Sequence, residues 1–151
     1  MLSLFFPTFA FSWQCQPITT QEALNNADLV FYGHVVDVTK PKRKNSAREI
    51  SVSFYVIKGY KGVKESGYIK SKYTLKAIYD SQFAGVGYGD SFKKNKDWLI
   101  YAKKHNDRRD NAVYWIEECA TKLISDAQDD IKTLNNIQID KKNNDSEKKS
   151  N

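Results

Sequence analysis

The segment from residue 50 to residue 56 alternates apolar and polar side chains, and this alternation constrains the fold more than any other feature of the sequence. Its apolar members are Ile50, Val52, Phe54 and Val56, and the intervening residues are Ser51, Ser53 and Tyr55. Because successive side chains of a strand point to opposite faces, the pattern predicts a strand with one face in a core. The 9 Tyr, 8 Phe and 3 Trp residues also favour strands over helices.

Four further segments are predicted to be strands. They cover residues 29–38, 67–75, 97–103 and 112–117. The first has apolar residues at both odd and even positions, which predicts a strand that is buried on both faces or coiled within a barrel. The polar, basic segment 40–48 and the glycine-rich run at 84–89 are predicted loops, and the latter lacks the Lys-Ser/Thr ending of a phosphate-binding loop.

Two helices are predicted on either side of these strands. Thr19 followed by Glu22 fits a capping box and predicts a short helix over residues 20–26. After Cys119 the apolar residues recur at helical spacing, at Leu123, Ile124, Ala127, Ile131 and Leu134. Residues 140–151 are polar and predict a disordered tail. A chain of 151 residues suits one domain, here mainly β.

The leader, residues 1–12, is apolar and uncharged, and small residues occupy Ala10 and Ser12. This pattern is typical of the end of a secretory signal peptide, so we expect the mature chain to begin at Trp13 in a secreted or periplasmic protein. The alternatives are a buried first strand or an uncleaved membrane anchor. Against an anchor, a bilayer-spanning helix needs about 20 apolar residues.

Export changes the interpretation of the two cysteines, Cys15 and Cys119. In an oxidising compartment, two cysteines in a small domain more often form a disulfide than a metal or redox site. Such a bond would close a loop of about 100 residues and stabilise the fold by roughly 4 to 5 kcal/mol in the chain-entropy model. The alternative is two separate buried thiols.

The order of these features resembles a known family. A cysteine motif at the mature start is followed by a helix, by ADLVFYGHVVDV, VSFYVIKGYKG, a glycine-containing loop and DWLIYA, and then by a late cysteine and an amphipathic helix. Over residues 13–136 this is similar to the netrin-like domain of the tissue inhibitors of metalloproteinases, and especially to bacterial secreted members. The resemblance implies that residues 13–139 form a closed, five-stranded OB-type barrel with the two helices packed beside it.

The chain departs from the family at its first cysteine. The family begins Cys-x-Cys, whereas this chain has Trp13, Gln14 and Cys15. The usual partner of the missing cysteine is also absent, since the glycine loop offers Val86 and Gly87. The resemblance pairs Cys15, which matches the second family cysteine, with Cys119.

The resemblance also implies a function for the start of the mature chain, which we call the N-terminal edge. Its members are Trp13, Gln14, Cys15, Gln16 and Pro17. In the animal inhibitors, the first residue chelates the zinc of the target protease through its α-amino group and carbonyl. Carried over, Trp13 would supply the amine and Gln14 the side chain that fills the specificity pocket. The alternative for Trp13 is an aromatic plug over one end of the barrel.

No catalytic, metal-binding or cofactor-binding constellation is predicted. His34 lies in a predicted strand and His105 in a polar turn, without the spacing of a zinc site or a nucleophile elbow. The carboxylates of Asp126, Asp129 and Asp130 are predicted on the solvated side of the closing helix.

The net charge of +6 suggests a basic binding surface as an alternative site. Its predicted members are Lys42, Arg43, Lys44, Lys70 and Lys72. Further lysines, at 58, 61, 64 and 76, lie near Tyr60, Tyr68 and Tyr73, as cations and aromatic rings do in single-strand binders. Export argues against nucleic acid and favours a protein partner or an acidic envelope polymer. The alternative functions are therefore a non-inhibitory scaffold that binds protein or polysaccharide, and a nucleic-acid binder.

Overall fold

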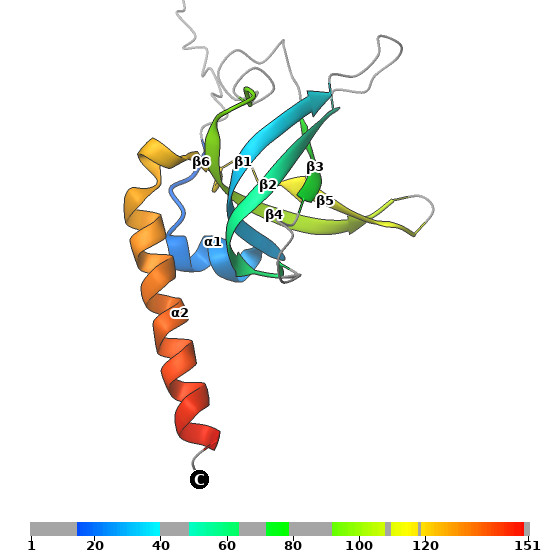
Figure 1. The fold of residues 1–151 in the computed structure, drawn as a ribbon. Helices are drawn as coiled ribbons and strands as arrows, with labels where there is room; N and C mark the ends of the chain where they lie inside the picture. The colour runs from blue at the N-terminus through cyan, green and yellow to red at the C-terminus, as the bar shows by residue number, and fades with distance from the viewer. Residues whose placement is uncertain are drawn as a thin grey trace, which may run out of the picture.

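The computed structural model describes residues 15–39, 49–63, 72–78, 92–107, 110–117 and 119–149. These residues form a mainly β fold with a short helix near the N-terminus and a long C-terminal helix (Figure 1). The elements are α1 (Thr20–Asn26), β1 (Leu29–Thr39), β2 (Glu49–Lys61), β3 (Lys72–Ile78), β4 (Asp97–Asn106), β5 (Ala112–Ile116), β6 (Lys122–Leu123), the 3₁₀ helix η2 (Ile124–Asp126) and α2 (Gln128–Lys149).

Five strands close into a barrel in the order β1-β2-β3-β5-β4, with β4 returning to β1. All neighbouring pairs are antiparallel except β3 and β5, which are parallel at Lys76 and Trp115. The register between β1 and β2 shifts three times, and such bulges bend a strand so that it can pair on both sides of a small barrel. The predicted closed, OB-type barrel is thus confirmed.

The interior of the barrel is filled by apolar and aromatic side chains. They are Leu29, Phe31, Val35, Ile50, Val52, Phe54, Val56, Leu75, Ala77, Phe92, Trp98, Ile100, Ala102 and Ile116. The Phe31 and Phe54 rings meet edge to face with centroids 5.6 Å apart, and the Phe92 and Trp98 centroids are 4.6 Å apart. The prediction that the strand at residues 50–56 has one face in a core is therefore confirmed, since all four of its apolar members lie inside the barrel.

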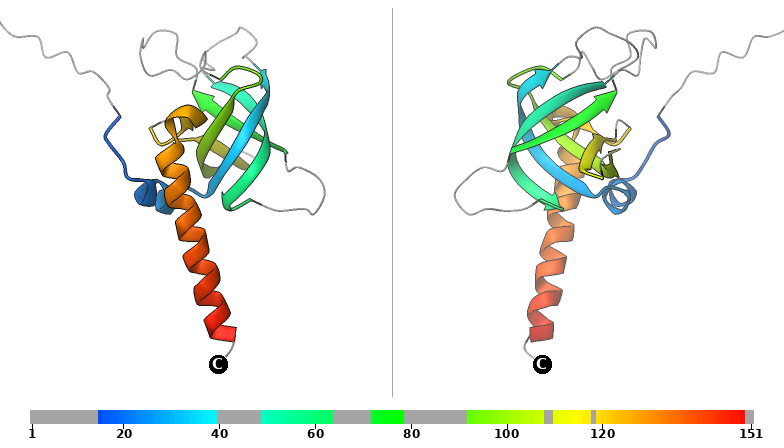
Figure 2. Two further views of the ribbon diagram at one scale, coloured as in Figure 1. Left: turned by 60° about the vertical axis from the view of Figure 1, so that its left-hand side comes forward. Right: turned by 90° about the vertical axis from the view of Figure 1, so that its right-hand side faces the viewer.

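The two helices lie beside the outer surface of the barrel (Figure 2). A second buried cluster lies beneath them. Its buried members are Ala23, Leu24, Ala27, Val30, Leu99, Tyr101, Ala120, Ala127 and Leu134. We call this cluster the helix-covered layer. It explains why β1 and β4 are apolar on both faces: Phe31 and Ile100 point into the barrel, while Val30 and Leu99 point outward under the helices.

The helices match their predictions unevenly. α1 has the predicted bounds, and its capping box is present. α2 begins only at Gln128, because β6 and η2 occupy the first part of the apolar repeat that predicts a helix. It then continues through Lys149, into the segment predicted as a disordered tail, and this part extends away from the barrel (Figures 1 and 2). Lys and Glu are good helix formers, so a helix can continue through this segment without apolar residues that pack on a core.

Several predicted features lie outside the described residues. They are the leader 1–12, Trp13, Gln14, the loops at 40–48 and 84–89, and the first part of the predicted strand 67–75, whose last part belongs to β3.

Candidate functional site

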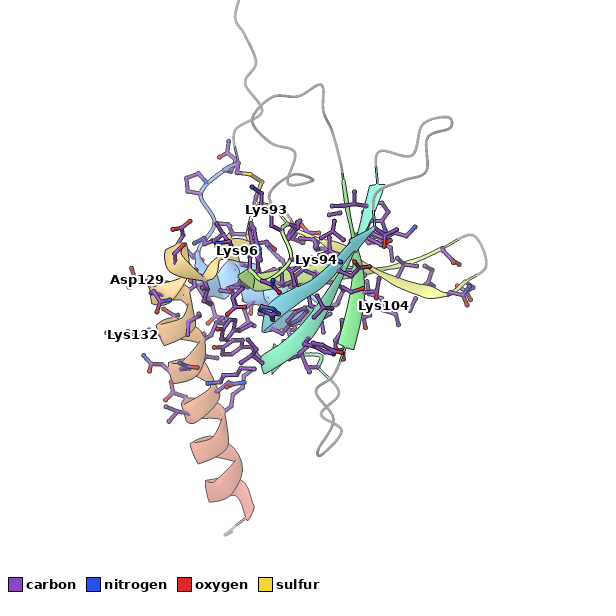
Figure 3. All side chains as sticks on the ribbon, turned by 45° about the horizontal axis from the view of Figure 1, so that its top comes forward. Lys93, Lys94, Lys96, Lys104, Asp129 and Lys132 are labelled. Carbon is purple, nitrogen blue, oxygen red and sulfur yellow. A yellow bond between two sulfur atoms is a disulfide. The ribbon has the colours of Figure 1, made fainter. Side chains whose placement is uncertain are left out.

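Cys15 and Cys119 form a disulfide, with their Cα atoms 5.3 Å apart and a sequence separation of 104. The predicted bond is confirmed, and the alternative of two buried thiols is wrong. Both cysteines are exposed on the surface of the protein (Figure 3). Structural disulfides are typical of proteins that fold in an oxidising, extracellular type of environment.

Cys119 is held by a turn between β5 and β6, which pair in succession with the same edge of β4. The Glu117 amide donates to the Tyr101 carbonyl at 2.8 Å, and the Thr121 amide donates to the Glu117 carbonyl at 3.0 Å. The buried Thr121 hydroxyl also accepts a hydrogen bond from the Tyr101 amide at 3.2 Å. These contacts fix the turn to the barrel, so the disulfide attaches Cys15 to a rigid support.

On the other side of the bond, Cys15 leads into α1. The Thr19 hydroxyl accepts from the Glu22 amide at 3.2 Å, while a Glu22 carboxylate oxygen accepts from the Thr19 amide at 3.0 Å. These hydrogen bonds from Thr19 lower the pKa of the Glu22 carboxyl. Ile18 packs against the helix-covered layer. The segment is therefore held at Cys15 and again at Ile18 and Thr19, and Gln16 and Pro17 between them are exposed.

The structure thus brings together three of the predicted members of the N-terminal edge, namely Cys15, Gln16 and Pro17. Trp13 and Gln14 lie outside the described residues. Lys42, Arg43, Lys44 and Lys70 of the predicted basic surface also lie outside them. Lys72 is described in its backbone alone, which pairs with Tyr55.

Among the described residues, Lys61, Tyr60 and Tyr73 do not form the predicted stacking surface; Lys64 and Tyr68 lie outside the described residues. Lys61 donates to the carbonyls of Leu24 and Asn25, at 2.9 and 3.2 Å, and so satisfies the C-terminal end of α1. Tyr60 packs against the helix-covered layer with its hydroxyl buried, and Tyr73 stacks on Phe31 with centroids 5.9 Å apart. Both rings are used in packing, which leaves them unsuited to stack on bases.

Among the carboxylates that the structure describes, the most buried belongs to Asp130 at the start of α2, which is 8% exposed. Its two oxygens accept from the Thr20 hydroxyl of α1 at 2.5 Å and from Lys122 Nζ of β6 at 2.7 Å. The prediction that Asp130 lies on the solvated side of the helix is wrong, whereas Asp126 and Asp129 are exposed. Asp130 joins three elements, and nothing in the local sequence distinguishes it from its two neighbours.

Tyr101 lies beside this carboxylate with its hydroxyl buried and without a hydrogen-bond partner among the described residues. Burial, together with the nearby Asp130 carboxylate and Tyr60, raises the pKa of Tyr101 well above its ordinary value. Burial also raises the pKa of Tyr60. These tyrosines are neutral packing residues rather than acids that work near neutral pH.

His34 and Asp97 are partners in the β1–β4 register, and His34 Nδ1 lies 2.6 Å from Asp97 Oδ1. The Tyr32 hydroxyl donates to the other carboxylate oxygen at 2.9 Å. The prediction that His34 lies in a strand is confirmed, and its ring is hydrogen-bonded there. His105 is exposed as expected, but it belongs to β4, where it pairs with Val113, rather than to a turn.

Among the described residues, no three His, Cys, Asp or Glu side chains gather closely enough to hold a metal ion. None of the described helices is long and apolar enough to cross a lipid bilayer. No protein-family model matches the chain, and no curated protein sequence is significantly similar to it. Fold and site together define a disulfide-bonded OB-type barrel whose described N-terminal segment is exposed and covalently anchored.

Proposed function

We propose that the protein is an exported, non-enzymatic binding module that contacts a zinc metalloproteinase through its N-terminal edge. The observation that carries the proposal is the Cys15–Cys119 disulfide, which holds an exposed, non-helical segment against the barrel. Ordering a loose segment on binding subtracts from affinity, so a segment that is already anchored binds at lower cost. The resemblance in the order of motifs supports the same type of inhibitor.

The chemistry requires cleavage of the leader before Trp13, two residues ahead of the anchored Cys15. The freed α-amino group has a pKa near 8, so a neutral amine that can bind the zinc of the partner is accessible at neutral pH. Gln14 then follows as the side chain for the specificity pocket, and Gln16 and Pro17 extend the contact. An acidic envelope polymer is the alternative partner, which the basic surface would bind.

Two measurements test the proposal in sequence. Mass spectrometry of the exported protein is expected to give a mature chain that begins at Trp13 and contains the disulfide. That chain is then assayed against a panel of secreted zinc metalloproteinases with a fluorogenic peptide. A second form carries one additional alanine before Trp13, and we expect its inhibition constant to rise by roughly 100-fold, because the chelating amine is displaced.

Lys132→Ala, on the exposed surface of α2, provides the matched control and should inhibit as well as the mature chain. A chain that retains its leader after export, or an alanine-extended form that inhibits equally well, would contradict the zinc-binding edge. If no protease of the panel is inhibited, the protein is a scaffold rather than an inhibitor.

A further inference from the structure

The outer surface of the barrel is only partly covered by the helices. Next to the helix-covered layer, a group of side chains on β1, β2 and β4 remains accessible, and we call it the Tyr55 face. Its members are Tyr32, His34, Tyr55, Ile57 and Asp97. Tyr55 is 43% exposed and Ile57 is 47% exposed, and both are among the exposed large hydrophobic side chains of the described chain. Their neighbours at outward positions of β2 are Ser51 and Ser53, the polar residues that an uncovered strand normally presents.

The polar members of the Tyr55 face are already oriented. Asp97 accepts from the Tyr32 hydroxyl and lies 2.6 Å from His34 Nδ1, so in the neutral ring Nδ1 carries the proton and Nε2 is the acceptor. His34 and Asp97 are 37% and 30% exposed. The register places Asp97 opposite His34, and His34 opposite Tyr55, in one row across three strands. Hydrogen-bonding groups and an aromatic ring therefore stand side by side.

A lysine turn at the start of β4 borders this row. Lys93, Lys94 and Lys96 are all exposed. The turn is fixed to β1 because the Val35 amide donates to the Lys96 carbonyl at 2.9 Å and the Asn95 amide donates to the Val35 carbonyl at 3.1 Å. Lys94 Nζ lies 3.0 Å from Asp37, which lowers the pKa of that carboxyl. In Figure 3 Lys94 lies beside β1, and Lys132 lies on α2.

The geometry points to the Tyr55 face and its lysine turn as a binding site for a carboxylated polysaccharide. The apolar face of a sugar ring packs on Tyr55 and Ile57, its hydroxyl groups bond to His34 Nε2 and to the Tyr32 oxygen, and its carboxylates approach Lys93 and Lys96. The charge of the turn is opposite to that of the ligand, and the rigid, aligned row needs little ordering on binding. This site is separate from the N-terminal edge and does not depend on the proposed function.

Two other classes of partner fit this surface less well. Single-stranded nucleic acid needs several stacking rings, whereas Tyr60, the next tyrosine along β2, packs against the helix-covered layer. A stable protein interface buries about 800 Å² on each partner around a well-packed apolar centre. Two half-exposed side chains, Tyr55 and Ile57, offer much less than that.

The test uses the disulfide-bonded chain and isothermal titration with four probes: a linear oligogalacturonate, an uncharged dextran oligosaccharide, a poly-glutamate peptide and a single-stranded oligothymidylate. We expect oligogalacturonate to bind most tightly. Tyr55→Ala should weaken its binding by about tenfold, because the ring contact is lost. Lys93→Ala combined with Lys96→Ala should also weaken it by about tenfold and reduce its dependence on salt.

Lys104→Ala combined with Lys132→Ala removes the same net charge from exposed positions elsewhere and should change the affinity less than twofold. Ile57→Asn provides a second test of the apolar contact, and the thermal midpoint of each variant shows that its fold is intact. Equal weakening by both lysine pairs would overturn the site, as would tighter binding of poly-glutamate or oligothymidylate, or an unchanged affinity in Tyr55→Ala and Ile57→Asn. Absence of oligogalacturonate binding at low salt would overturn it as well.

Discussion

The interior of the barrel and the helix-covered layer are both buried, but they are built from different chemistry. The interior contains only apolar and aromatic side chains among the described residues. The helix-covered layer adds the Asp130 carboxylate, with its bonds from Thr20 and Lys122, and the buried hydroxyls of Tyr60 and Tyr101. The disulfide joins the segment before α1 to the turn before β6, and both of these contribute residues to the helix-covered layer.

The difference follows from how each region is enclosed. Strands that pair with one another satisfy their own backbone groups, so the barrel interior needs only side chains of suitable volume. The helix-covered layer joins α1 to α2 and to the turn before β6, and α1 lies far from both of them in sequence. Apolar contacts alone do not direct a helix to one position, whereas a charged hydrogen bond has a fixed geometry. Polar and covalent links therefore occur where separate elements must be positioned.

The largest effect should come from removing the covalent link. Cys15→Ser combined with Cys119→Ser opens a loop of 104 residues, and the chain-entropy model then predicts a loss of about 4 to 5 kcal/mol in the free energy of unfolding. Urea unfolding of the variant and of the wild type in dithiothreitol should give the same midpoint. A loss below about 1 kcal/mol would mean that packing alone holds the N-terminal segment.

The next effect probes the barrel interior. Phe54→Ala removes a fully buried ring that contacts Phe31 and Phe92, and it should lower the free energy of unfolding by about 4 kcal/mol. Ile57→Ala, on the same strand but 47% exposed, should change it by less than about 0.5 kcal/mol. Equal losses from the two substitutions, measured by urea unfolding, would contradict the assignment of inside and outside on β2.

A smaller effect is expected from the polar link of the helix-covered layer. Asp130→Asn keeps the shape of the side chain but removes the charge that Thr20 and Lys122 donate to, at an expected cost of about 2 kcal/mol. The control is Asp129→Asn, an exposed residue in the same first turn of α2, which loses a similar helix-dipole interaction of about 0.5 kcal/mol. If the two variants are equally stable, the buried link contributes nothing beyond the dipole.

The smallest effect at neutral pH should come from Tyr101→Phe. The Tyr101 hydroxyl has no partner among the described residues, so its removal should change stability by less than about 0.5 kcal/mol at pH 7. In the folded protein the pKa of Tyr101 is raised, so the unfolded chain releases the proton first. The wild type therefore loses stability as pH rises above about 10, by up to about 1.4 kcal/mol per pH unit.

Tyr101→Phe should lose less stability over that alkaline range, because it cannot ionise. Urea unfolding of both proteins at several pH values checks the difference. Parallel losses would show that Tyr101 ionises as easily in the folded protein as in the unfolded chain.

Much of the fold was predictable because its signals are local. The alternation at residues 50–56 and the pair Thr19 and Glu22 each act within a few residues, and the structure has β2 and α1 at these places. The apolar repeat after Cys119 is also a local signal, and the helix start that it predicts is wrong. Its first members belong to β6 and η2, where pairing with Trp98 and Leu99 overrides the helical spacing.

The candidate sites were less accessible to sequence reasoning. Sequence identified Cys15 and Cys119 as the members of a bond, because they are the only two cysteines. It did not single out Lys93 and Lys96 or the row of Asp97, His34 and Tyr55, since these residues become neighbours only through the pairing of β4, β1 and β2. No spacing along the chain marks such a row.

The sequence by itself determined where β1, β2, β4 and β5 lie, which residues cap α1 and which two sulfur atoms can be joined, because these depend on period and on composition. Only the tertiary structure decided that Asp130 is buried and that Tyr55 is left uncovered. The reason is that helix placement determines which part of the outer barrel surface meets solvent, and that placement arises from contacts between elements that lie far apart in the chain.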